Sequence, residues 1–487
     1  MNLIPNKPGV TPNYYCTWSA QNSFYNLKDD PDAFAGAGGA GIARDSINEE
    51  TVFGEKGMAH IYEKVRGDLY FVLDDGWDIP YGLEAASQRY EFGSLLLNEA
   101  RFPECAGAPK DRLAKINQKL KDLGWRGVGL WVASQAHGEK DEESVLQEDA
   151  FKTYWTKRME WCKDAGIYYW KVDWGYHESN NAWREALSAL GRDQYPELWI
   201  EQCRCIMPVN EDEGRFGYPR YIMEVLAFSD VFRSYDVLSQ LSVATTLDRL
   251  GVLLQGELQA QAKGIINCED ELYMGAALGC SVGVMRNRGK MDEVIRAIRW
   301  HRIAPPFSIR DNQTYLSEEL GTDKWYLKPG ECWAEQYTNK EISQTAPLVI
   351  SRGIALPVVE GKTEEKPFVV AAGNPNGAVS IATLARHQNG TIETPRCIIT
   401  LDVGNSDVPI GIFGKYDKLT LKFDHPIRDK QVWAQDLMGD EAVDITNDVL
   451  QEDTTITIPG EVIDRIGLSC RTMPSDGSDP GIVLVLR

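Results

Sequence analysis

Histidine is scarce in this chain, and its cysteines are widely spaced. Only six of the 487 residues are His, and Cys203 and Cys205 are the only two of the ten Cys that lie close together. Structural zinc sites use Cys or His ligands at short, regular spacing, and no CxxC pair is present. The sequence therefore predicts no zinc site, and most of the thiols are expected to be buried as small apolar side chains.

Long apolar runs are also missing. No segment reaches the roughly 18 apolar residues that a membrane-spanning helix requires. Residues 1–10, MNLIPNKPGV, have neither the basic start nor the apolar core of a signal peptide. These features predict a cytoplasmic protein, or a mature chain from which a leader has been removed.

Positive charge is in short supply. The chain has 51 Lys and Arg against 72 Asp and Glu, which gives a formal net charge of −21. Nucleic acids and anionic membrane surfaces need a basic footprint on the protein, so neither is an expected partner. The acidity favours a neutral or cationic ligand, or it serves only to keep the protein soluble.

A regular alternation of short apolar segments and longer amphipathic segments fills the first ~300 residues. The longer segments carry apolar side chains at helical spacing, as in Leu113, Ile116 and Leu120. Eight strand–helix units of this kind predict a (β/α)8 TIM barrel. An open doubly wound sheet is the alternative, but no GxGxxG loop follows a strand. The predicted strands are 14–18, 69–73, 127–132, 167–172, 198–200, 231–235, 264–267 and 281–285.

From about residue 366 the pattern changes to short strands with alternating side chains. Leu419, Leu421 and Phe423 share one face of KLTLKF, and Ile456 and Ile458 share one face of TTITI. Such strands, separated by Gly and Asn turns, predict a C-terminal antiparallel β-sandwich. We therefore expect a catalytic barrel at residues 1–335 and a β-sandwich domain at residues 336–487.

Acidic residues end most of the predicted barrel strands. Catalytic groups of a (β/α)8 barrel lie at the carboxyl ends of its strands, so these acids should meet at one face. Glu269 and Asp270 either join them or cap the following helix. The other acids in this position are Asp74, Asp75, Asp173, Glu201 and Asp236.

A ring of carboxylates without a histidine cluster has two main chemical uses. It can bind a divalent metal through several oxygens, or it can hydrolyse a glycosidic bond with one attacking and one proton-donating carboxyl group. Lys171 and Arg233 lie on the strands that carry Asp173 and Asp236. A metal cage would not normally contain two cations, so we favour a glycosidase that needs no metal and no cofactor.

Several motifs resemble those of the clan D glycoside hydrolases, the retaining α-galactosidase families 27 and 36. The matching segments, in order, are FVLDDGW at 71–77, RFPE at 101–104, GVGLWVASQ at 127–135 and YYWKVDWG from 168. DDGW followed by the K-x-D of Lys171 and Asp173 is the most specific part. The resemblance covers about the first 300 residues.

This resemblance implies that Asp173 is the nucleophile and forms a covalent glycosyl-enzyme. It also implies that Asp74 and Asp75 bind sugar hydroxyls distant from the reacting carbon, and that Lys171 binds hydroxyls near it. Trp18 is similar to the platform tryptophan of the family. The alternative for Asp173 and Lys171 is a buried structural ion pair.

By the same resemblance, Asp236 in FRSYD is the acid/base, and Arg233 resembles the arginine that precedes it in family 27. Glu201 resembles a sugar ligand on the fifth strand. Trp77 and Trp131 either line the sugar site or belong to the core. Asp236 and Arg233 could also form only a structural pair. In a retaining enzyme the two carboxyl groups should lie about 5–5.5 Å apart.

The sequence thus predicts a retaining, exo-acting glycoside hydrolase, most similar to α-galactosidases, that acts on an oligosaccharide or a polysaccharide side chain. Two departures put the sugar itself in question. Trp174 and Gly175 follow Asp173 where family 27 has a cysteine nearby, and Val132 to Gln135 replace acids of family 36. The alternatives are an α-N-acetylgalactosaminidase, a β-L-arabinopyranosidase, a raffinose-synthase-like transglycosidase or a non-catalytic carbohydrate-binding barrel.

Overall fold

The computed structural model describes most of the chain. The ranges are 1–21, 43–78, 94–134, 148–175, 177–204, 220–234, 243–286, 289–327, 340–388, 390–472 and 476–487.

Eight parallel strands form the N-terminal sheet, in the order β7-β6-β5-β4-β3-β2-β1-β8. The sheet comes close to closing, because a parallel bridge joins Asn267 at the end of β7 to Ser281 just before β8. The prediction of a barrel is confirmed, and each of the eight predicted strands is present. Their bounds are β1 Tyr14–Cys16, β2 Tyr70–Leu73, β3 Gly127–Val132, β4 Tyr169–Val172, β5 Trp199–Gln202, β6 Val231–Arg233, β7 Ile265–Asn267 and β8 Gly283–Val284.

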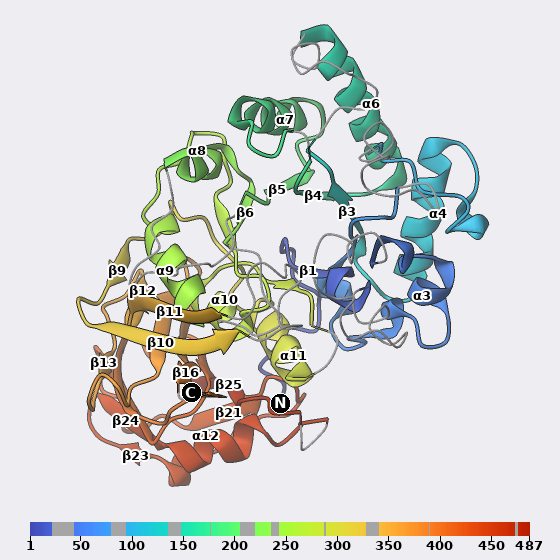
Figure 1. The fold of residues 1–487 in the computed structure, drawn as a ribbon. Helices are drawn as coiled ribbons and strands as arrows, with labels where there is room; N and C mark the ends of the chain where they lie inside the picture. Colours follow the sequence, from blue (N-terminus) through green and yellow to red (C-terminus); the bar gives the residue numbers. More distant parts are fainter. Residues whose placement is uncertain are drawn as a thin grey trace.

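Helices follow the strands and surround the barrel (Figure 1). The predicted stripe of Leu113, Ile116 and Leu120 is buried on α4, and Gly124 follows that helix with a φ of +92°. A left-handed glycine directly after the last helical turn is a common way for a helix to end. The described helices here are α3 Glu49–Phe53, α4 Pro109–Asp122, α6 Glu148–Ala165, α7 Asn181–Gln194, α8 Arg220–Phe228, α9 Val243–Leu253, α10 Leu272–Leu278 and α11 Met291–Trp300.

Large and small side chains are matched inside the barrel. The Tyr14 ring fills the space beside Gly283, where an added Cβ would come within 2.4 Å of the ring. Gly129 leaves similar room beside Tyr169 and Val72. Because alternate residues of each strand point inward, a strand that ends with an inward polar residue presents it at the barrel mouth.

The C-terminal region contains two large sheets, which confirms the predicted β architecture. One has eight strands, in the order β22-β21-β25-β19-β15-β14-β12-β9, and the other has five, in the order β13-β18-β20-β24-β23. Most pairs are antiparallel, with parallel pairs at β12–β14, β15–β19 and β18–β20.

The strands of this region lie between residues 314 and 486. They are β9 Thr314–Leu316, β10 Leu320–Leu327, β11 Lys340–Pro347, β12 Val349–Arg352, β13 Val358–Val359, β14 Phe368–Gly373, β15 Val379–Leu384, β16 Arg386–Gln388, β17 Thr391–Glu393, β18 Ile398–Gly404, β19 Ile410–Phe413, β20 Lys418–Phe423, β21 Val432–Asp436, β22 Val443–Asp444, β23 Leu450–Gln451, β24 Thr455–Pro459 and β25 Gly481–Leu486, with helix α12 at Gly460–Gly467.

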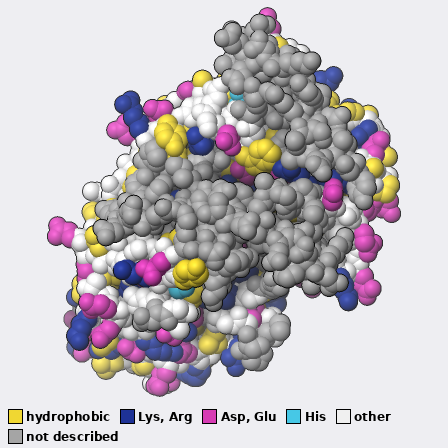
Figure 2. Space-filling view, viewed as in Figure 1, with side chains coloured by type: hydrophobic (Ala, Val, Ile, Leu, Met, Phe, Trp, Pro, Cys, Tyr) yellow, Lys and Arg dark blue, Asp and Glu magenta, His cyan; other side chains and the backbone are white. Residues whose placement is uncertain are grey.

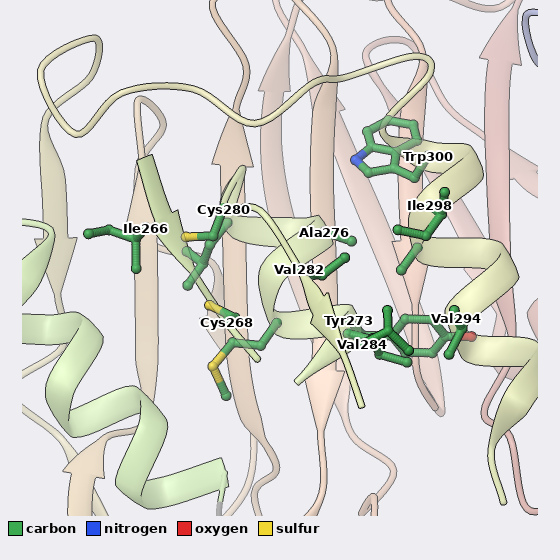
Figure 3. Packing of buried hydrophobic residues seen from close by; sticks show 14 of the residues in the cluster. Ile266, Cys268, Tyr273, Ala276, Cys280, Val282, Val284, Val294, Ile298 and Trp300 are labelled. Carbon is green, nitrogen blue, oxygen red and sulfur yellow. The ribbon is translucent and has the colours of Figure 1, made fainter. Parts of the chain in front are cut away.

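The last two barrel helices join the barrel to the eight-stranded sheet. Figure 3 shows Val284 of β8, Tyr273 of α10 and Val294 of α11 lying close together. On α11, Arg296 forms a fully buried ion pair with Asp436 of β21, at 3.0 Å from Nε to Oδ1. Trp300 packs on Gly411 of β19, where a side chain would clash with the indole. The two regions therefore share one apolar core.

The predicted domain boundary at 335/336 falls between described residues 327 and 340. Strand β9, at Thr314–Leu316, already pairs with β12 in the eight-stranded sheet, and β10 pairs with β11 across the gap. We therefore propose that the boundary lies between Trp300, the end of α11, and Thr314.

The cysteines agree with the sequence analysis. Seven of the eight cysteines in the described ranges are buried free thiols, and Cys470 is exposed. In the described ranges, each helix is too short or too polar to cross a lipid bilayer. Figure 2 shows acidic side chains interspersed with Lys and Arg around the visible face.

Candidate active site

Asp173 directly follows β4 at the carboxyl end of the barrel strands. Its side chain is 17% exposed. Trp131 donates an indole hydrogen bond to Asp173 Oδ2 at 3.2 Å, and Arg233 lies 3.3 Å from Oδ1. Burial alone would raise the pKa of Asp173, but Arg233, Lys171 and the Trp131 hydrogen bond outweigh it and lower that pKa below its ordinary value. Asp173 is therefore an ionised carboxylate at neutral pH.

Lys171, two residues earlier on the same inward face of β4, lies deeper. Its Nζ is 2.9 Å from Asp74 Oδ2 and 3.4 Å from Cys16 Sγ. Glu269 Oε2 is 3.8 Å away. Burial would lower the pKa of Lys171, but Asp74 and Glu269 hold it well above its ordinary value. The ammonium group thus stays charged below the nucleophile candidate.

Glu269 joins the two cations of the site. One oxygen lies 3.8 Å from Lys171, and the other lies 3.6 Å from Arg233 NH1. Glu269 is 1% exposed. It comes from the loop after β7, whereas Lys171 and Arg233 come from β4 and β6, so its position fixes two cations from different strands.

Glu201, on β5, pairs in register with Lys171 of β4 and is buried inside the barrel. It accepts hydrogen bonds from Tyr169 at 2.6 Å, Asn267 at 2.7 Å and Tyr14 at 3.1 Å. Tyr14 also donates to Glu269 at 2.8 Å. Because Glu201 is completely buried and surrounded by protein donors, its contacts favour a role in holding the site together.

Asp74 and Asp75 have different partners. Asp74 accepts from Lys171 and from the Cys16 thiol at 2.9 Å, whereas both oxygens of Asp75 contact Arg44, at 2.9 and 2.8 Å. Burial raises the pKa of Asp75 to about 6 in spite of Arg44. The DDGW pair thus extends the network in two directions, toward the barrel axis and toward the rim.

The three predicted tryptophans have distinct settings. Trp131 is buried with its indole nitrogen on Asp173, and Trp77 is buried with its indole nitrogen on the Trp131 carbonyl at 2.9 Å. Trp18 lies two residues after the end of β1, is partly buried, and packs against the inward side chains of the barrel. Trp131 therefore lines the site, and Trp77 supports it.

Asp236, the predicted acid/base, lies outside the described residues, and its role stays a prediction. Asp270 accepts the backbone N–H groups of Met285 and Arg286, at 3.0 and 3.2 Å. These two hydrogen bonds fix the backbone that follows β8. They do not join Asp270 to the other residues of the site. Glu269, its neighbour, is the member of this pair that joins the network.

Five contributors were not singled out from the sequence: Tyr14, Cys16, Arg44, Tyr169 and Asn267. Three of them lie two residues before a predicted site residue or an acid at a strand end, as Tyr169 does before Lys171, and Tyr14 lies two residues before Cys16. Because residues two apart on a strand point to the same face, this spacing could have indicated that these side chains also point into the barrel. Arg44 comes from the segment between β1 and β2 and carries no such signal.

No group of three or more His, Cys, Asp or Glu with the geometry of a metal site occurs within the described ranges. Scans against protein-family models and curated proteins found no match.

Solved structures with similar chains include α-galactosidase I from Mortierella vinacea, with 10% identity, 98% of this chain and 97% of that chain covered, and a TM-score of 0.41. A GH27 β-L-arabinopyranosidase from Geobacillus stearothermophilus has 9% identity, coverage of 99% and 96%, and a TM-score of 0.39. An α-amylase from Geobacillus thermoleovorans has 10% identity, 98% coverage of both chains and a TM-score of 0.44.

Proposed function

We propose that this protein is a retaining glycoside hydrolase with Asp173 as its nucleophile. The observation that carries the proposal is a partly exposed, ionised carboxylate held by Arg233 and Trp131 above a buried Lys171–Asp74 pair. An attacking carboxylate must be ionised and accessible, and both conditions are met at Asp173.

The surrounding charges suit a neutral, hydroxyl-rich substrate. Lys171 offers N–H donors and Asp74 offers acceptor oxygens, only 2.9 Å apart. A sugar hydroxyl both donates and accepts, so one hydroxyl can bond to both members of such a pair. We infer that Asp74 and Lys171 bind the hydroxyls of the sugar whose anomeric carbon reaches Asp173.

In the proposed reaction, Asp173 attacks the anomeric carbon and forms a covalent glycosyl-enzyme. Asp236 protonates the leaving oxygen and then removes a proton from the attacking water. The proposal for Asp236 rests on its sequence position alone. The two carboxyl groups must come within about 5–5.5 Å for this retaining chemistry.

We propose an α-galactoside as the first substrate to test. The support is the order and spacing of DDGW at 74–77 and of Lys171 and Asp173. β-L-Arabinopyranosides differ from α-galactosides only around the sixth carbon, and α-N-acetylgalactosaminides only at the second, so both belong in the same panel.

The test is a panel of nitrophenyl glycosides assayed with three proteins: wild type, Asp173→Asn and Asp164→Asn. Asp164 provides a matched control because it undergoes the same chemical change on α6, where it is 58% exposed and pairs with Lys110. We expect wild type and Asp164→Asn to release nitrophenol from one member of the panel, and Asp173→Asn to release none. Equal rates for Asp173→Asn and wild type would exclude Asp173 as nucleophile.

Nuclear magnetic resonance of the first sugar released distinguishes the stereochemical course. Retention of the anomeric configuration is expected, and inversion would contradict the covalent intermediate. Transfer of the sugar to an added acceptor sugar, in preference to water, would indicate a transglycosidase. Sugar binding without turnover of any member of the panel would indicate a carbohydrate-binding barrel.

A further inference from the structure

Trp174, the residue after Asp173, is a large aromatic side chain that remains 40% exposed. Among the large apolar residues of the described chain, most are buried, and an exposed tryptophan next to a reactive carboxylate is unusual. Its backbone and its ring are both held in place by the surrounding structure.

The backbone on either side of Trp174 is fixed to the end of β3. Ser134 N–H donates to the Trp174 carbonyl at 3.1 Å, and Asp173 N–H donates to the Val132 carbonyl at 2.9 Å. Gly175 has a φ of +154°, and a Cβ there would lie 2.8 Å from Ser134 N. Only glycine allows this close approach, so the tryptophan is anchored on both sides.

Two buried side chains hold the Trp174 ring. The Arg44 guanidinium lies 5.1 Å from the ring centroid, in the range of a cation–π contact. Arg44 is itself fixed by its two contacts to Asp75. The ring of Trp131, whose indole nitrogen bonds to Asp173, lies 6.1 Å away at an interplanar angle of 62°. Trp174 is thus oriented by the same residues that form the site.

Exposure increases from the floor of the site to Trp174. Lys171 and Asp74 are 2% and 4% exposed, Asp173 is 17% exposed, and Trp174 is 40% exposed. A sugar bound at Lys171 and Asp74 with its anomeric carbon at Asp173 must therefore extend its remaining part outward. Trp174 lies at this outer level.

We propose that Trp174, oriented by Arg44, is a platform for the sugar ring on the leaving-group side of the scissile bond. This inference rests on the proposed function. One face of a pyranose ring presents C–H groups, which pack favourably on an indole, whereas a small leaving group cannot cover that surface. Trp174 would therefore determine preference for oligosaccharides over simple glycosides.

The test compares two substrates that share a glycon, beginning with α-galactose: its methyl glycoside and its disaccharide with glucose. In wild type, kcat/KM should be higher for the disaccharide. Trp174→Ala should reduce the ratio of disaccharide to methyl-glycoside kcat/KM roughly tenfold, and Trp174→Tyr should restore most of it. An unchanged ratio in Trp174→Ala would overturn the proposal.

Tyr168→Ala is the matched control. Tyr168 is also 40% exposed, but it lies before β4, at the opposite end of the barrel. Its removal should leave both kcat/KM values unchanged. A loss of the same size in Tyr168→Ala would show that the effect comes from general loss of aromatic surface and would count against a platform.

A binding measurement separates this inference from the proposed function. Calorimetric titration of α-galactosyl-glucose into Asp173→Asn, with and without Trp174→Ala, requires no turnover. Tighter binding in the presence of Trp174, even in a protein that hydrolyses nothing, would support the platform while the hydrolase proposal fails. Binding that is equally tight with and without Trp174 would overturn the platform even if wild type proves to be a hydrolase.

Discussion

Two aspartates at opposite ends of the barrel both pair with cations, but they differ in whether the acid or the cation is exposed to solvent. Asp230, just before β6, is 3% exposed, and its cations Arg192 and Lys263 are 16% and 32% exposed. Asp173, just after β4, is 17% exposed, and its cation Arg233 is only 2% exposed. At one end the acid is covered and the cations face solvent, whereas at the other the cation is covered and the acid faces solvent.

This difference separates an acid with a structural role from the acid that we propose as the nucleophile. A covered carboxylate with surface cations holds β5 and β6 in place, and Asp230 Oδ2 also lies 3.4 Å from the backbone N of Ile200. An exposed carboxylate above buried cations keeps its charge and remains accessible to a substrate. Barrel enzymes place stability at the amino ends of the strands and chemistry at the carboxyl ends, as this contrast suggests.

Replacing each of the two aspartates in turn should give the largest effect and tests the comparison directly. Asp173→Asn should lower kcat by at least about 1,000-fold, because the amide cannot attack the anomeric carbon. Asp230→Asn should leave kcat within about twofold while lowering the free energy of unfolding by about 1–3 kcal/mol. Steady-state rates and urea unfolding of both variants check this, and the reverse assignment of effects would contradict it.

Asp78 extends the comparison to an acid that is buried with little compensation from cations. Burial raises its pKa to about 7, although the Leu95 N–H donates to it at 3.1 Å. The folded protein therefore binds this proton more tightly than the unfolded chain, so Asp78 costs stability as the pH rises from about 4 through 7.

Asp78→Asn should remove this cost. The difference in free energy of unfolding between Asp78→Asn and wild type should grow in favour of the variant by roughly 2–4 kcal/mol from pH 4 to pH 7. Asp173 has a lowered pKa, so the stability that its charge contributes is lost only as the pH falls below about 4, and the curves for Asp173→Asn and wild type should run nearly parallel between pH 4 and pH 7. Urea unfolding at several pH values measures both, and parallel curves for Asp78→Asn and wild type would exclude the raised pKa.

A smaller effect tests the cations themselves. Arg233→Gln removes a charge 3.3 Å from Asp173, so the pKa of Asp173 should rise by about 1 unit or more. The acid limb of the pH profile of kcat/KM should then move to higher pH by the same amount. Lys263→Gln, the corresponding change beside Asp230, should leave the profile in place. An acid limb that does not move in Arg233→Gln would argue against this electrostatic role.

The fold and part of the site could be predicted because both follow from local patterns. Each barrel strand is a short apolar run, and an acid just after such a run must lie at the carboxyl edge of a parallel barrel. This reasoning placed Asp74, Asp75 and Asp173 directly after β2 and β4, where the structure has them, and their roles stay a prediction. Residues 305–365 followed no clear pattern, yet they contain β9 to β13, because short strands paired with distant partners leave little local periodicity.

The connections of the site could not be predicted, because they join residues far apart in the chain. Tyr14 reaches Glu201 across the barrel from 187 positions away, and Glu269 joins cations from β4 and β6. No period in the sequence encodes which inward side chains meet. Likewise, nothing at Asp75 or Trp174 in the sequence indicates that Arg44 lies between them.

The central claim is that Asp173 bonds covalently to the sugar, and direct trapping tests it. Wild-type protein is incubated with a slowly hydrolysed, activated fluoroglycoside of the preferred sugar, then digested, and its peptides are weighed and fragmented by mass spectrometry. We predict that the peptide containing Asp173 gains the mass of one glycosyl group, bonded to that side chain. A glycosyl group on any other carboxylate, or steady turnover of a natural substrate through inversion with no adduct, would contradict the account.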